Sequence, residues 1–424
     1  MSKIKNLVIL HLTSTIGSGA GRFTVDFHRS ILSCGYESYI ANYGQEIIFP
    51  DGTRHKIKQT KSFWWNKLRR WLFRLVIKHS KIDNAYSMYN LCERFTCHSA
   101  ADMLAAMPKK PDVVFVHWVS DFANAEFLHE LKQLTGVEIV FLLVDHALYS
   151  GGCHYQIDCQ GYKDGCHNCL ATTSRIVQRG IEKNYAFKKK YIPHGTIIVP
   201  TKEDDSRLLQ SSIYRSFRFE KLVIPIDAKK FSPIEDRMKL RRQWRIPTDK
   251  KIVFFGATNL NERRKGIKEL LEAFPLVQTK DVIYMAAGKV NDLDLPTATI
   301  PVGILYEAQL IQMYQMADVY VCPSLADGGP MMVNQAVLCG TPVVAFPVGV
   351  SVELVKTGET GYQALYGDPK DLAKGIDYVL NLSQEEWMEM SQKCRKIGVN
   401  TYANPNENNT IEAFMKKLCQ VTNK

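Results

Sequence analysis

The sequence lacks any apolar run long enough to cross a membrane, which needs roughly 20 consecutive apolar residues. Near its start, the run at residues 7–12 is too short for the core of a signal peptide, and no cleavage site follows it. We interpret this run as a first buried strand and expect a cytoplasmic protein. Its 11 cysteines are then mostly reduced.

Acidic residues are absent between positions 54 and 81, although ten lysines or arginines lie there. The whole chain carries a net charge of +11, so this basicity is local and argues for a local partner. A helix over residues 63–81 would place apolar side chains on one face and basic side chains in a stripe beside it. The apolar side chains are Trp64, Leu68, Trp71, Leu72 and Leu75, and the basic ones are Lys67, Arg70, Arg74, Lys78 and Lys81.

An aromatic and apolar face next to a basic stripe is typical of helices that lie in a membrane interface. We therefore expect this helix to bind an anionic membrane surface. In one alternative, the tryptophans and leucines pack onto the protein and the charges are solvated. In another, the charges bind nucleic acid, but no nucleic-acid motif accompanies them, so we expect no nucleic-acid partner.

Residues 323–346 have the pattern of a strand end, a glycine turn, a short helix and a second strand. Gly328 and Gly329 let the backbone approach a ligand without a Cβ clash, and Asp327 lies on the turn before them. Gly340 ends the helix. A helix N-terminus at the carboxyl end of a parallel strand is where α/β sheets bind ligands, and its N–H groups suit phosphate. An ordinary strand–turn–helix without a ligand is the alternative.

Two further loops have patterns that suit phosphate. Arg263, Arg264 and Lys265 lie at the start of a predicted helix, where cations oppose the helix dipole unless an anion accompanies them. A phosphate site is the natural interpretation, and solvated charge is the alternative. Near the N-terminus, a glycine loop joins the first strand to the first helix as in phosphate-binding loops, although glycine there also serves tight packing. Its glycines are Gly17, Gly19 and Gly21.

Four cysteines lie close together in the sequence after a strand that ends at Asp145. They are Cys153, Cys159, Cys166 and Cys169. Four thiolates in a short span, two of them in a C-x2-C pair, suit the tetrahedral geometry of zinc, with His154 and His167 as substitute ligands. We expect a structural zinc that holds a loop near the active cleft. Four buried or free thiols in a compact loop are the alternative.

In this order, the motifs resemble those of the retaining family 4 glycosyltransferases over nearly the whole chain. The resemblance rests on Pro-Ser at 323, Asp327, Gln335 eight positions later, Cys-Gly-Thr-Pro from 339, and Lys-Gly at 265. The sequence Gly-Gly-Cys-His-Tyr at 151–155 resembles one subgroup of that family.

This resemblance implies an α/β fold with two Rossmann-like domains that face each other across a cleft. Residues 1–200 would form an N-terminal acceptor-binding domain that carries the basic helix and the cysteine cluster. Residues 201–400 would form a C-terminal domain that binds a nucleotide sugar. Residues 401–424 would form a helix that crosses back and packs on the first domain.

The resemblance also implies a reaction, in which a sugar moves from a nucleoside diphosphate to an acceptor hydroxyl with retention of configuration. Lys265, with Arg263 or Arg264, would neutralise the departing diphosphate, so we expect no catalytic metal. The glycine loop at 17–21 would close over the same diphosphate.

Three further residues take roles from the resemblance. Asp327 would accept hydrogen bonds from the sugar hydroxyls, Gln335 would meet the ribose, and Asp145 is the candidate for a contact to the donor sugar. The basic amphipathic helix indicates a lipid-linked acceptor, such as a growing surface polysaccharide. It also indicates a peripheral location on the inner face of the cell membrane.

The chain departs from the family at three positions. Relatives usually carry two glutamates where this chain has Asp327 and Gln335, and an arginine where it has Ala257. An amide accepts hydrogen bonds more weakly than a carboxylate and also donates them, so we expect looser ribose recognition. The alternative is a non-catalytic protein of the same fold that binds a nucleotide sugar or a glycan. Consumption of the donor discriminates between the two.

Overall fold

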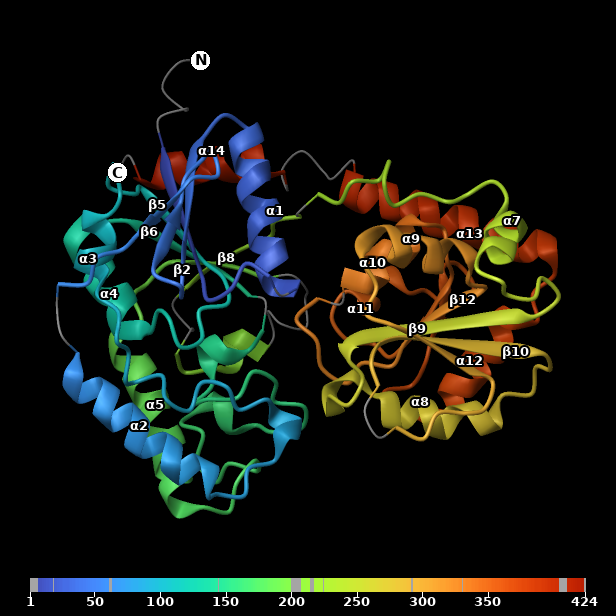
Figure 1. The fold of residues 1–424 in the computed structure, drawn as a ribbon, viewed down its shortest axis with the longest axis horizontal. Helices are drawn as coiled ribbons and strands as arrows, with labels where there is room; N and C mark the ends of the chain where they lie inside the picture. The colour runs from blue at the N-terminus through green and yellow to red at the C-terminus, as the bar shows by residue number, and fades with distance from the viewer. Residues whose placement is uncertain are drawn as a thin grey trace. The chain divides into compact units, whose positions relative to one another are not determined.

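The structure is a computed structural model of the chain. It describes residues 7–17, 19–60, 63–143, 145–199, 207–213, 217–223, 225–290, 293–329, 331–403 and 410–422. The chain divides into two compact units, one made of Met1–Ile224 with Glu407–Lys424 and one of Pro225–Asn406 (Figure 1). Each unit has its own sheet and its own hydrophobic core.

The sheet of the first unit has eight strands among the described residues, in the order β4-β3-β2-β1-β5-β6-β7-β8. Pairing is parallel from β2 to β8, and β3 and β4 add an antiparallel edge. The strands are β1 (Val8–Thr13), β2 (Glu37–Asn42), β3 (Glu46–Ile48), β4 (Arg54–Lys56), β5 (Val113–Val116), β6 (Glu138–Leu142), β7 (Thr196–Ile198) and β8 (Arg218–Glu220).

Helices cover both faces of this first sheet. Side chains of α1 and α14 pack with Ile9, Phe115 and Val140 in one core cluster. Residues of α3, α4 and α5 pack with Leu10 and Val114, which point to the opposite face, in another cluster. The helices are α1 (Gly19–Ser33), α2 (Trp64–Lys78), α3 (Ala100–Ala105), α4 (Ala125–Thr135), α5 (Arg175–Tyr191) and α14 (Ile411–Thr422), with short 3-10 turns η2 (Asn84–Tyr86), η3 (Ala147–Tyr149) and η4 (Gly161–Lys163).

The described strands of the second unit are all parallel, in the order β11-β10-β9-β12-β13-β14. Numbered from β9, this is the 3-2-1-4-5-6 order of a doubly wound nucleotide-binding sheet. The strands are β9 (Lys251–Asn259), β10 (Val282–Lys289), β11 (Thr299–Gly303), β12 (Val319–Cys322), β13 (Val343–Ala345) and β14 (Gly361–Gln363).

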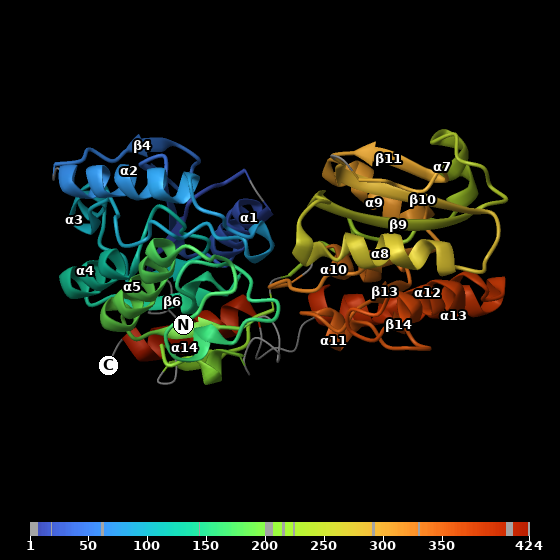
Figure 2. The ribbon, with the colours of Figure 1, turned by 90° about the horizontal axis from the view of Figure 1, so that it is seen from below.

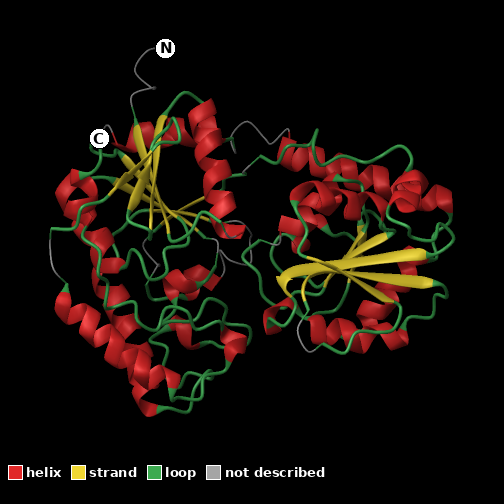
Figure 3. Cartoon of the chain, viewed as in Figure 1, coloured by secondary structure: helices red, strands yellow, loops and turns green. Residues whose placement is uncertain are grey.

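In the second unit, helices lie on both sides of the sheet, as the ribbon coloured by secondary structure shows (Figure 3). Strands buried on both faces are apolar throughout, and this explains runs such as Val-Tyr-Val-Cys in β12. The helices are α7 (Arg237–Gln243), α8 (Ile267–Ala273), α9 (Glu307–Met316), α10 (Met331–Leu338), α11 (Ser351–Leu354), α12 (Pro369–Leu380) and α13 (Gln384–Gly398), with η5 (Arg263–Lys265), η6 (Phe274–Leu276) and the π-helical η7 (Val399–Ala403).

The division between the units lies after residue 224, and not after residue 200 as the sequence analysis placed it. The reason is that β7 and β8 both pair in the first sheet, so the first domain extends past residue 200. The short strand β8 has the sequence Arg-Phe-Glu, which carries no apolar run to mark it. Helix α14 belongs to the first unit.

The basic helix forms as α2, and one residue that we expected in its exposed basic stripe is placed differently. Arg70, which we placed in the exposed basic stripe, is buried and forms an ion pair with Asp121. The tryptophans are exposed, so they do not pack onto the domain. Among the described residues, no helix is both long enough and apolar enough to span a bilayer.

Candidate functional site

The candidate donor site lies where the strand order of the second sheet reverses. Strands β9 and β12 are neighbours there, and the chain leaves them toward opposite halves of the sheet. Lys265 follows β9 and Asp327 follows β12, both at the carboxyl ends. Ligands of open α/β sheets bind at this reversal, because the two departing loops leave a crevice between them.

The structure brings three predicted residues together at this reversal. Lys265 Nζ lies 2.5 Å and Arg264 Nη1 lies 3.2 Å from the same oxygen, Asp327 Oδ2. The side chain of Asp327 is only 10% exposed. Burial raises the pKa of Asp327, but the charges of Lys265 and Arg264 and a hydrogen bond from the Gly329 backbone outweigh it, so the pKa lies below its ordinary value. The carboxylate is therefore ionised at neutral pH.

Backbone contacts hold the two loops in place. The N–H groups of Leu325 and Ala326 both point at the carbonyl oxygen of Arg264, at 2.7 and 3.3 Å. Gly266 has φ +65°, and a Cβ built on it would lie 1.7 Å from the carbonyl oxygen of Pro323. Only glycine fits at this turn, and its fit sets the position of Lys265 against the end of β12.

The other predicted residues of this loop pair have different partners. Both terminal nitrogens of Arg263 contact the carboxylate of Glu269, at 2.8 and 2.6 Å, so this guanidinium is engaged within its own helix start. Arg264 is therefore the arginine at Asp327. Gln335, on α10, accepts a hydrogen bond from the hydroxyl of Tyr314 at 3.1 Å, a partner that the sequence analysis did not predict.

The two glycines of the turn before α10 differ in backbone conformation and in burial. Gly329 has φ +141°, in a region that favours glycine, and a Cβ there would meet no atom within 4 Å. Gly328 is buried. The open space beside Gly329 lies next to the Asp327 carboxylate, which its backbone contacts.

In the first unit, the glycine loop joins β1 to α1 as expected, but the helix begins earlier than predicted. Gly19 is the first residue of α1, and Gly21 lies in its first turn. A Cβ on Gly21 would come within 2.3 Å of the carbonyl oxygen of Thr15, so glycine is needed there for close packing. Gly17 and Gly19 face open space.

Asp145 is held by a buried histidine that the sequence analysis had assigned as a substitute zinc ligand. His154 Nδ1 lies 2.6 Å from Asp145 Oδ2, and the backbone N–H of Ala147 donates to the other carboxylate oxygen at 2.8 Å. Burial raises the pKa of Asp145, but His154 and these hydrogen bonds hold it below its ordinary value. Ser120 lies 3.2 Å from His154 Nε2 and Trp118 Nε1 lies 3.1 Å from His154 Nδ1.

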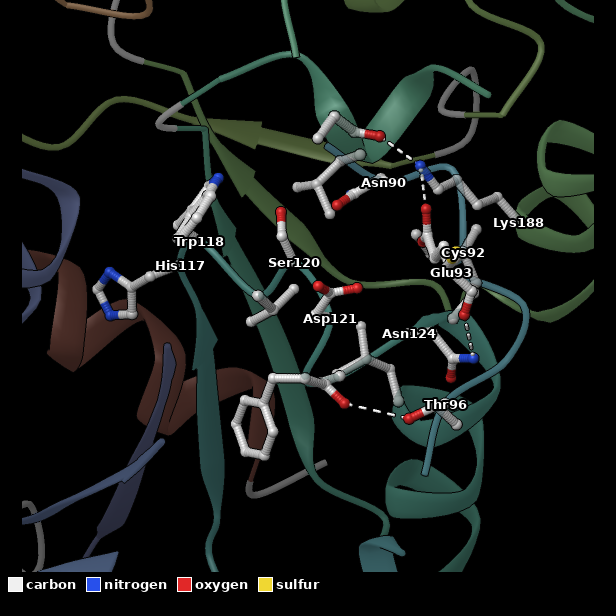
Figure 4. Close-up of a pocket in the computed structure, with 18 of the residues that line it drawn as sticks. Asn90, Cys92, Glu93, Thr96, His117, Trp118, Ser120, Asp121, Asn124 and Lys188 are labelled. Atoms are coloured by element: carbon white, nitrogen blue, oxygen red, sulfur yellow. Dashed lines mark hydrogen bonds and ion pairs between the residues drawn. The ribbon is translucent and has the colours of Figure 1, made fainter. Parts of the chain in front are cut away.

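A pocket opens at the carboxyl ends of β5 and β6, beside Asp145. Figure 4 shows Trp118, Ser120 and Asp121, which follow β5, opposite Glu93 and Lys188, which form an ion pair of 2.8 Å. Its charged lining residues are Arg70, Glu93, Asp121, Asp145 and Lys188. The sequence signal for this pocket was the strand that ends in His117-Trp118.

Two buried polar atoms of residues that line this pocket have neither a hydrogen-bond partner nor an ion-pair partner within the described part of the chain. They are Asn90 Oδ1 and His117 Nδ1. Burial lowers the pKa of His117 to about 3, so the ring is neutral, and its other nitrogen lies 2.9 Å from His11. The His117 ring packs against His11, Phe23 and Phe27, so Asn90 Oδ1 is the atom suited to bind a hydroxyl group in this pocket.

The four cysteines share one loop region but form no ready metal site. All four are free thiols, and burial raises the pKa of Cys153 and Cys169 and raises that of Cys166 to about 12. The N–H groups of Gly151 and Gly161 point at the sulfurs of Cys166 and Cys159. Among the described residues, which include all four, no group of three or more His, Cys, Asp or Glu side chains is arranged to hold a metal.

Comparison with known proteins shows that the second unit resembles glycosyltransferases. Residues 236–400 match the family described as glycosyl transferases group 1. An uncharacterized glycosyltransferase of Methanocaldococcus jannaschii is 26% identical over 158 residues, which cover 35% of this chain and 40% of that protein. The N,N'-diacetylbacillosaminyl-diphospho-undecaprenol alpha-1,3-N-acetylgalactosaminyltransferase of Campylobacter jejuni is 22% identical over 173 residues, 37% of this chain and 43% of that protein. The chain therefore matches less than half the length of either relative.

Solved structures extend the likeness of fold to the full chain. Sucrose-phosphate synthase from Thermosynechococcus elongatus superposes with a TM-score of 0.68 at 15% identity, over 99% of this chain and 98% of that one. Anabaena HepE in complex with UDP-glucose gives 0.59 at 13% identity, over 99% and 100%. The chain therefore has the two-domain, Rossmann-like fold found in solved glycosyltransferases, and its residues 236–400 match the glycosyl transferases group 1 family.

Proposed function

We propose that the protein transfers a sugar from a nucleoside diphosphate sugar to a hydroxyl group of a glycan acceptor. The observation that carries this proposal is the cluster of Lys265, Arg264 and Asp327 at the strand reversal of a sheet that matches glycosyl transferases group 1. The complex of Anabaena HepE with UDP-glucose supports a nucleotide-sugar donor for this fold.

In the proposed reaction, the acceptor oxygen forms a bond to the sugar as the bond between the sugar and the diphosphate breaks. Negative charge develops on the departing diphosphate, which takes up the proton of the acceptor hydroxyl. Lys265 and Arg264, whose side chains are mostly buried, neutralise this charge, so their interaction with the diphosphate is strongest as the bond breaks. The diphosphate takes the place that Asp327 holds between the two cations. The released carboxylate of Asp327 then accepts hydrogen bonds from sugar hydroxyls.

The remaining roles follow the same proposal. Gln335 meets the ribose, and the glycine loop with Gly17 and Gly19 supplies backbone N–H groups to the diphosphate. Asp145 contacts the donor sugar. The two cations make a catalytic metal unnecessary, and retention of configuration is carried over from the resemblance to family 4.

The acceptor that we propose is a lipid-linked glycan, such as a growing surface polysaccharide. The relative from Campylobacter jejuni is named for an acceptor of that kind, a sugar on diphospho-undecaprenol. A lipid-linked acceptor places the protein at a membrane surface, and we propose a peripheral location on the inner face of the cell membrane.

Donor consumption tests the proposed function. Purified protein is incubated with a panel of UDP- and GDP-sugars and with undecaprenyl diphosphate glycans in vesicles, and the released nucleoside diphosphate is measured. We expect Lys265→Ala to lower kcat by about 100-fold or more, because one preorganised charge at the leaving group is lost. Lys268→Ala removes an exposed lysine three residues further on and should leave kcat unchanged. Equal activity of both variants would contradict the proposed role.

A second candidate function is binding of a nucleotide sugar or glycan without turnover. Gln335 and Ala257 favour it, because both replace charged residues of the family. Thermal-shift screening separates the candidates when it is combined with the donor assay. A ligand at 100 times its dissociation constant stabilises the folded state by roughly 2.7 kcal/mol. A stabilising donor that is never consumed in the presence of an accepted glycan would favour the binding protein.

We also propose, as a separate point, that the Gly-Gly-Cys-His-Tyr subgroup motif belongs to a structural zinc site. The support is that backbone N–H groups already point at two of the four sulfurs, as outer-shell donors do around metal ligands. Zinc binding would require these protonated thiols to ionise and the loop to contract around the metal. Metal analysis of reduced protein purified without chelators tests this, and protein without stoichiometric zinc rules it out.

A further inference from the structure

Helix α2 carries a row of large apolar side chains that face solvent. The side chains of Trp64 and Trp65 are 73% and 74% exposed, and Trp71 is 57% exposed. Leu68, Leu72 and Leu75 extend the row along the same outer side and are 38%, 49% and 40% exposed. Figures 1 and 2 show α2 at the outside of the first unit in both views. We call these six residues the outer face of α2.

A different row of side chains attaches α2 to the protein. Asn66 Nδ2 donates to the carbonyl oxygen of Thr96 at 3.0 Å, and Arg70 forms its buried ion pair with Asp121. The Phe73 ring packs against Gly180 of α5 so closely that a Cβ there would lie 2.5 Å from it. Val76 and Ile77 pack on the core of the first unit. These anchoring contacts therefore come from the side of the helix opposite its outer face.

The outer face is thus an apolar surface that remains exposed to solvent in the folded chain. Three tryptophans exposed together on one helix are unusual, since a contiguous exposed apolar patch marks an interaction site. Tryptophan in particular is enriched at the membrane–water interface, where its ring is buried and its N–H stays hydrated.

The charge around the outer face selects one kind of surface. Lys67, Arg69, Arg74 and Lys78 are all exposed on α2, and residues 54–81 contain no acidic side chain. Asp121 pairs with Arg70 and Arg74, so among the described residues the uncompensated charges of α2 are those of Lys67, Arg69 and Lys78. The patch therefore combines apolar anchors with uncompensated positive charge, and its complement is a negatively charged bilayer.

We propose that the outer face of α2 docks onto an anionic lipid bilayer, with the tryptophans inserted at headgroup depth. The inner side of the same helix reaches the pocket at the ends of β5 and β6, because Arg70 and its partner Asp121 both line it. Docking places that pocket beside the bilayer, where a lipid-linked acceptor presents its sugar. This last step rests on the proposed function, and the docking itself does not.

The test is flotation of the full chain with vesicles of phosphatidylcholine alone and with about 30% phosphatidylglycerol. We expect binding to the anionic vesicles and little to the neutral ones. The double variant Trp64→Ala/Trp71→Ala should bind anionic vesicles at least tenfold more weakly. A matched control, Leu134→Ala/Ile176→Ala, removes two other exposed apolar side chains of the first unit and should bind as the parent does.

Charge is tested in the same assay. Lys67→Glu/Arg69→Glu should weaken binding by at least tenfold, since each basic residue near the surface contributes roughly a fivefold gain in affinity. Lys280→Glu/Lys396→Glu makes the same change in net charge on exposed lysines of the second unit and should have little effect. All four variants alter exposed side chains, so their thermal unfolding should match that of the parent, which confirms that they are folded.

Four results would overturn the proposal. Equal binding of neutral and anionic vesicles, or unchanged binding by the tryptophan variant, would do so. So would a lipid-free dimer that the tryptophan variant converts to a monomer while vesicle binding is absent, because the outer face would then be an interface between two copies. Preference for DNA or RNA over anionic vesicles would assign the charges to nucleic acid. Flotation needs no turnover, so inactive protein that floats would refute the proposed function alone.

Discussion

At the scale of single residues, the candidate donor site consists of the Asp327 carboxylate, which lies between the cations Lys265 and Arg264. Asp327 shares one oxygen with Lys265 and Arg264, and Arg264 also pairs with Glu262 at 2.8 Å, so two carboxylates balance the two cations before a ligand arrives. An uncompensated buried charge is costly, and the mutual pairing avoids this cost. A diphosphate would exchange one anion for another at the cations and release the carboxylate for sugar hydroxyls.

The amide at position 335 can be tested by restoring the family's carboxylate. Gln335→Glu keeps the length of the side chain and its acceptor oxygen toward Tyr314. A carboxylate accepts hydrogen bonds from both ribose hydroxyls more strongly, by about 1–2 kcal/mol, so donor binding should tighten by roughly tenfold. Isothermal titration with the preferred nucleotide sugar measures the change.

Gln392→Glu is the control for the added charge, because Gln392 is exposed on α13 of the same unit. It should leave the dissociation constant unchanged. If Gln335→Glu abolishes turnover, the amide has a role of its own as a hydrogen-bond donor, and the expectation of looser ribose recognition is wrong.

At the scale of elements, local sequence signals predicted the donor loops well. The apolar runs and the glycines around 323–346 predicted a strand, a turn and a helix, and the structure has β12, α10 and β13 there. The same signals did not predict which side chains contact one another. Arg263 and Arg264 are adjacent in the sequence, and only the fold shows that one contacts Glu269 and the other Asp327.

Helix α2 shows why orientation was harder to predict than the helix itself. It has apolar residues on two sides, Trp71 on the outer side and Phe73 on the inner, so periodicity alone does not decide which side packs. Arg70 fits a basic stripe by spacing, but its partner Asp121 lies about 50 residues further along the chain. Long-range pairs of this kind leave no local signal.

The turn at Gly266 allows a prediction at this scale. Gly266→Ala places a Cβ 1.7 Å from the Pro323 carbonyl oxygen in a left-handed backbone. Gly303 is the matched control, because it has φ +69° but its Cβ would meet nothing within 4 Å. We expect Gly303→Ala to lower the free energy of unfolding by about 1–2 kcal/mol, because alanine is strained in a left-handed backbone. Gly266→Ala should cost roughly twice that or more and should also weaken donor binding, since Lys265 moves with the turn.

Denaturant unfolding of both variants, with nucleotide-sugar titration beside it, measures the two effects. A Gly266→Ala protein as stable as Gly303→Ala would show that the loop shifts away from β12 without loss, and then the packing at Pro323 does not set the position of Lys265.

At the scale of the whole molecule, two folding units are joined by a chain that leaves the first and returns to it. The fold class was predictable because the motifs occur in order, and the comparisons with solved structures confirm it. The boundary was placed too early because β8 is short and its residues are not apolar throughout. The sequence of α14 is amphipathic, and the structure shows which apolar residues it packs against.

Because the chain returns to the first unit, we expect its last helix, α14, to stabilise the first unit and not the second. Phe414 is 2% exposed and lies in one core cluster with Ile9 and Val140, and its ring centroid is 6.3 Å from that of Phe115. Phe414→Ala leaves a cavity in that cluster and should cost about 3–5 kcal/mol. Calorimetry should show the transition of the first unit lowered and that of the second unit unchanged. Met388→Ala, an exposed change on α13, should move neither transition by more than about 0.5 kcal/mol. Equal shifts of both transitions in Phe414→Ala would mean that the two units unfold together, and the assignment of α14 to the stability of the first unit alone would be wrong.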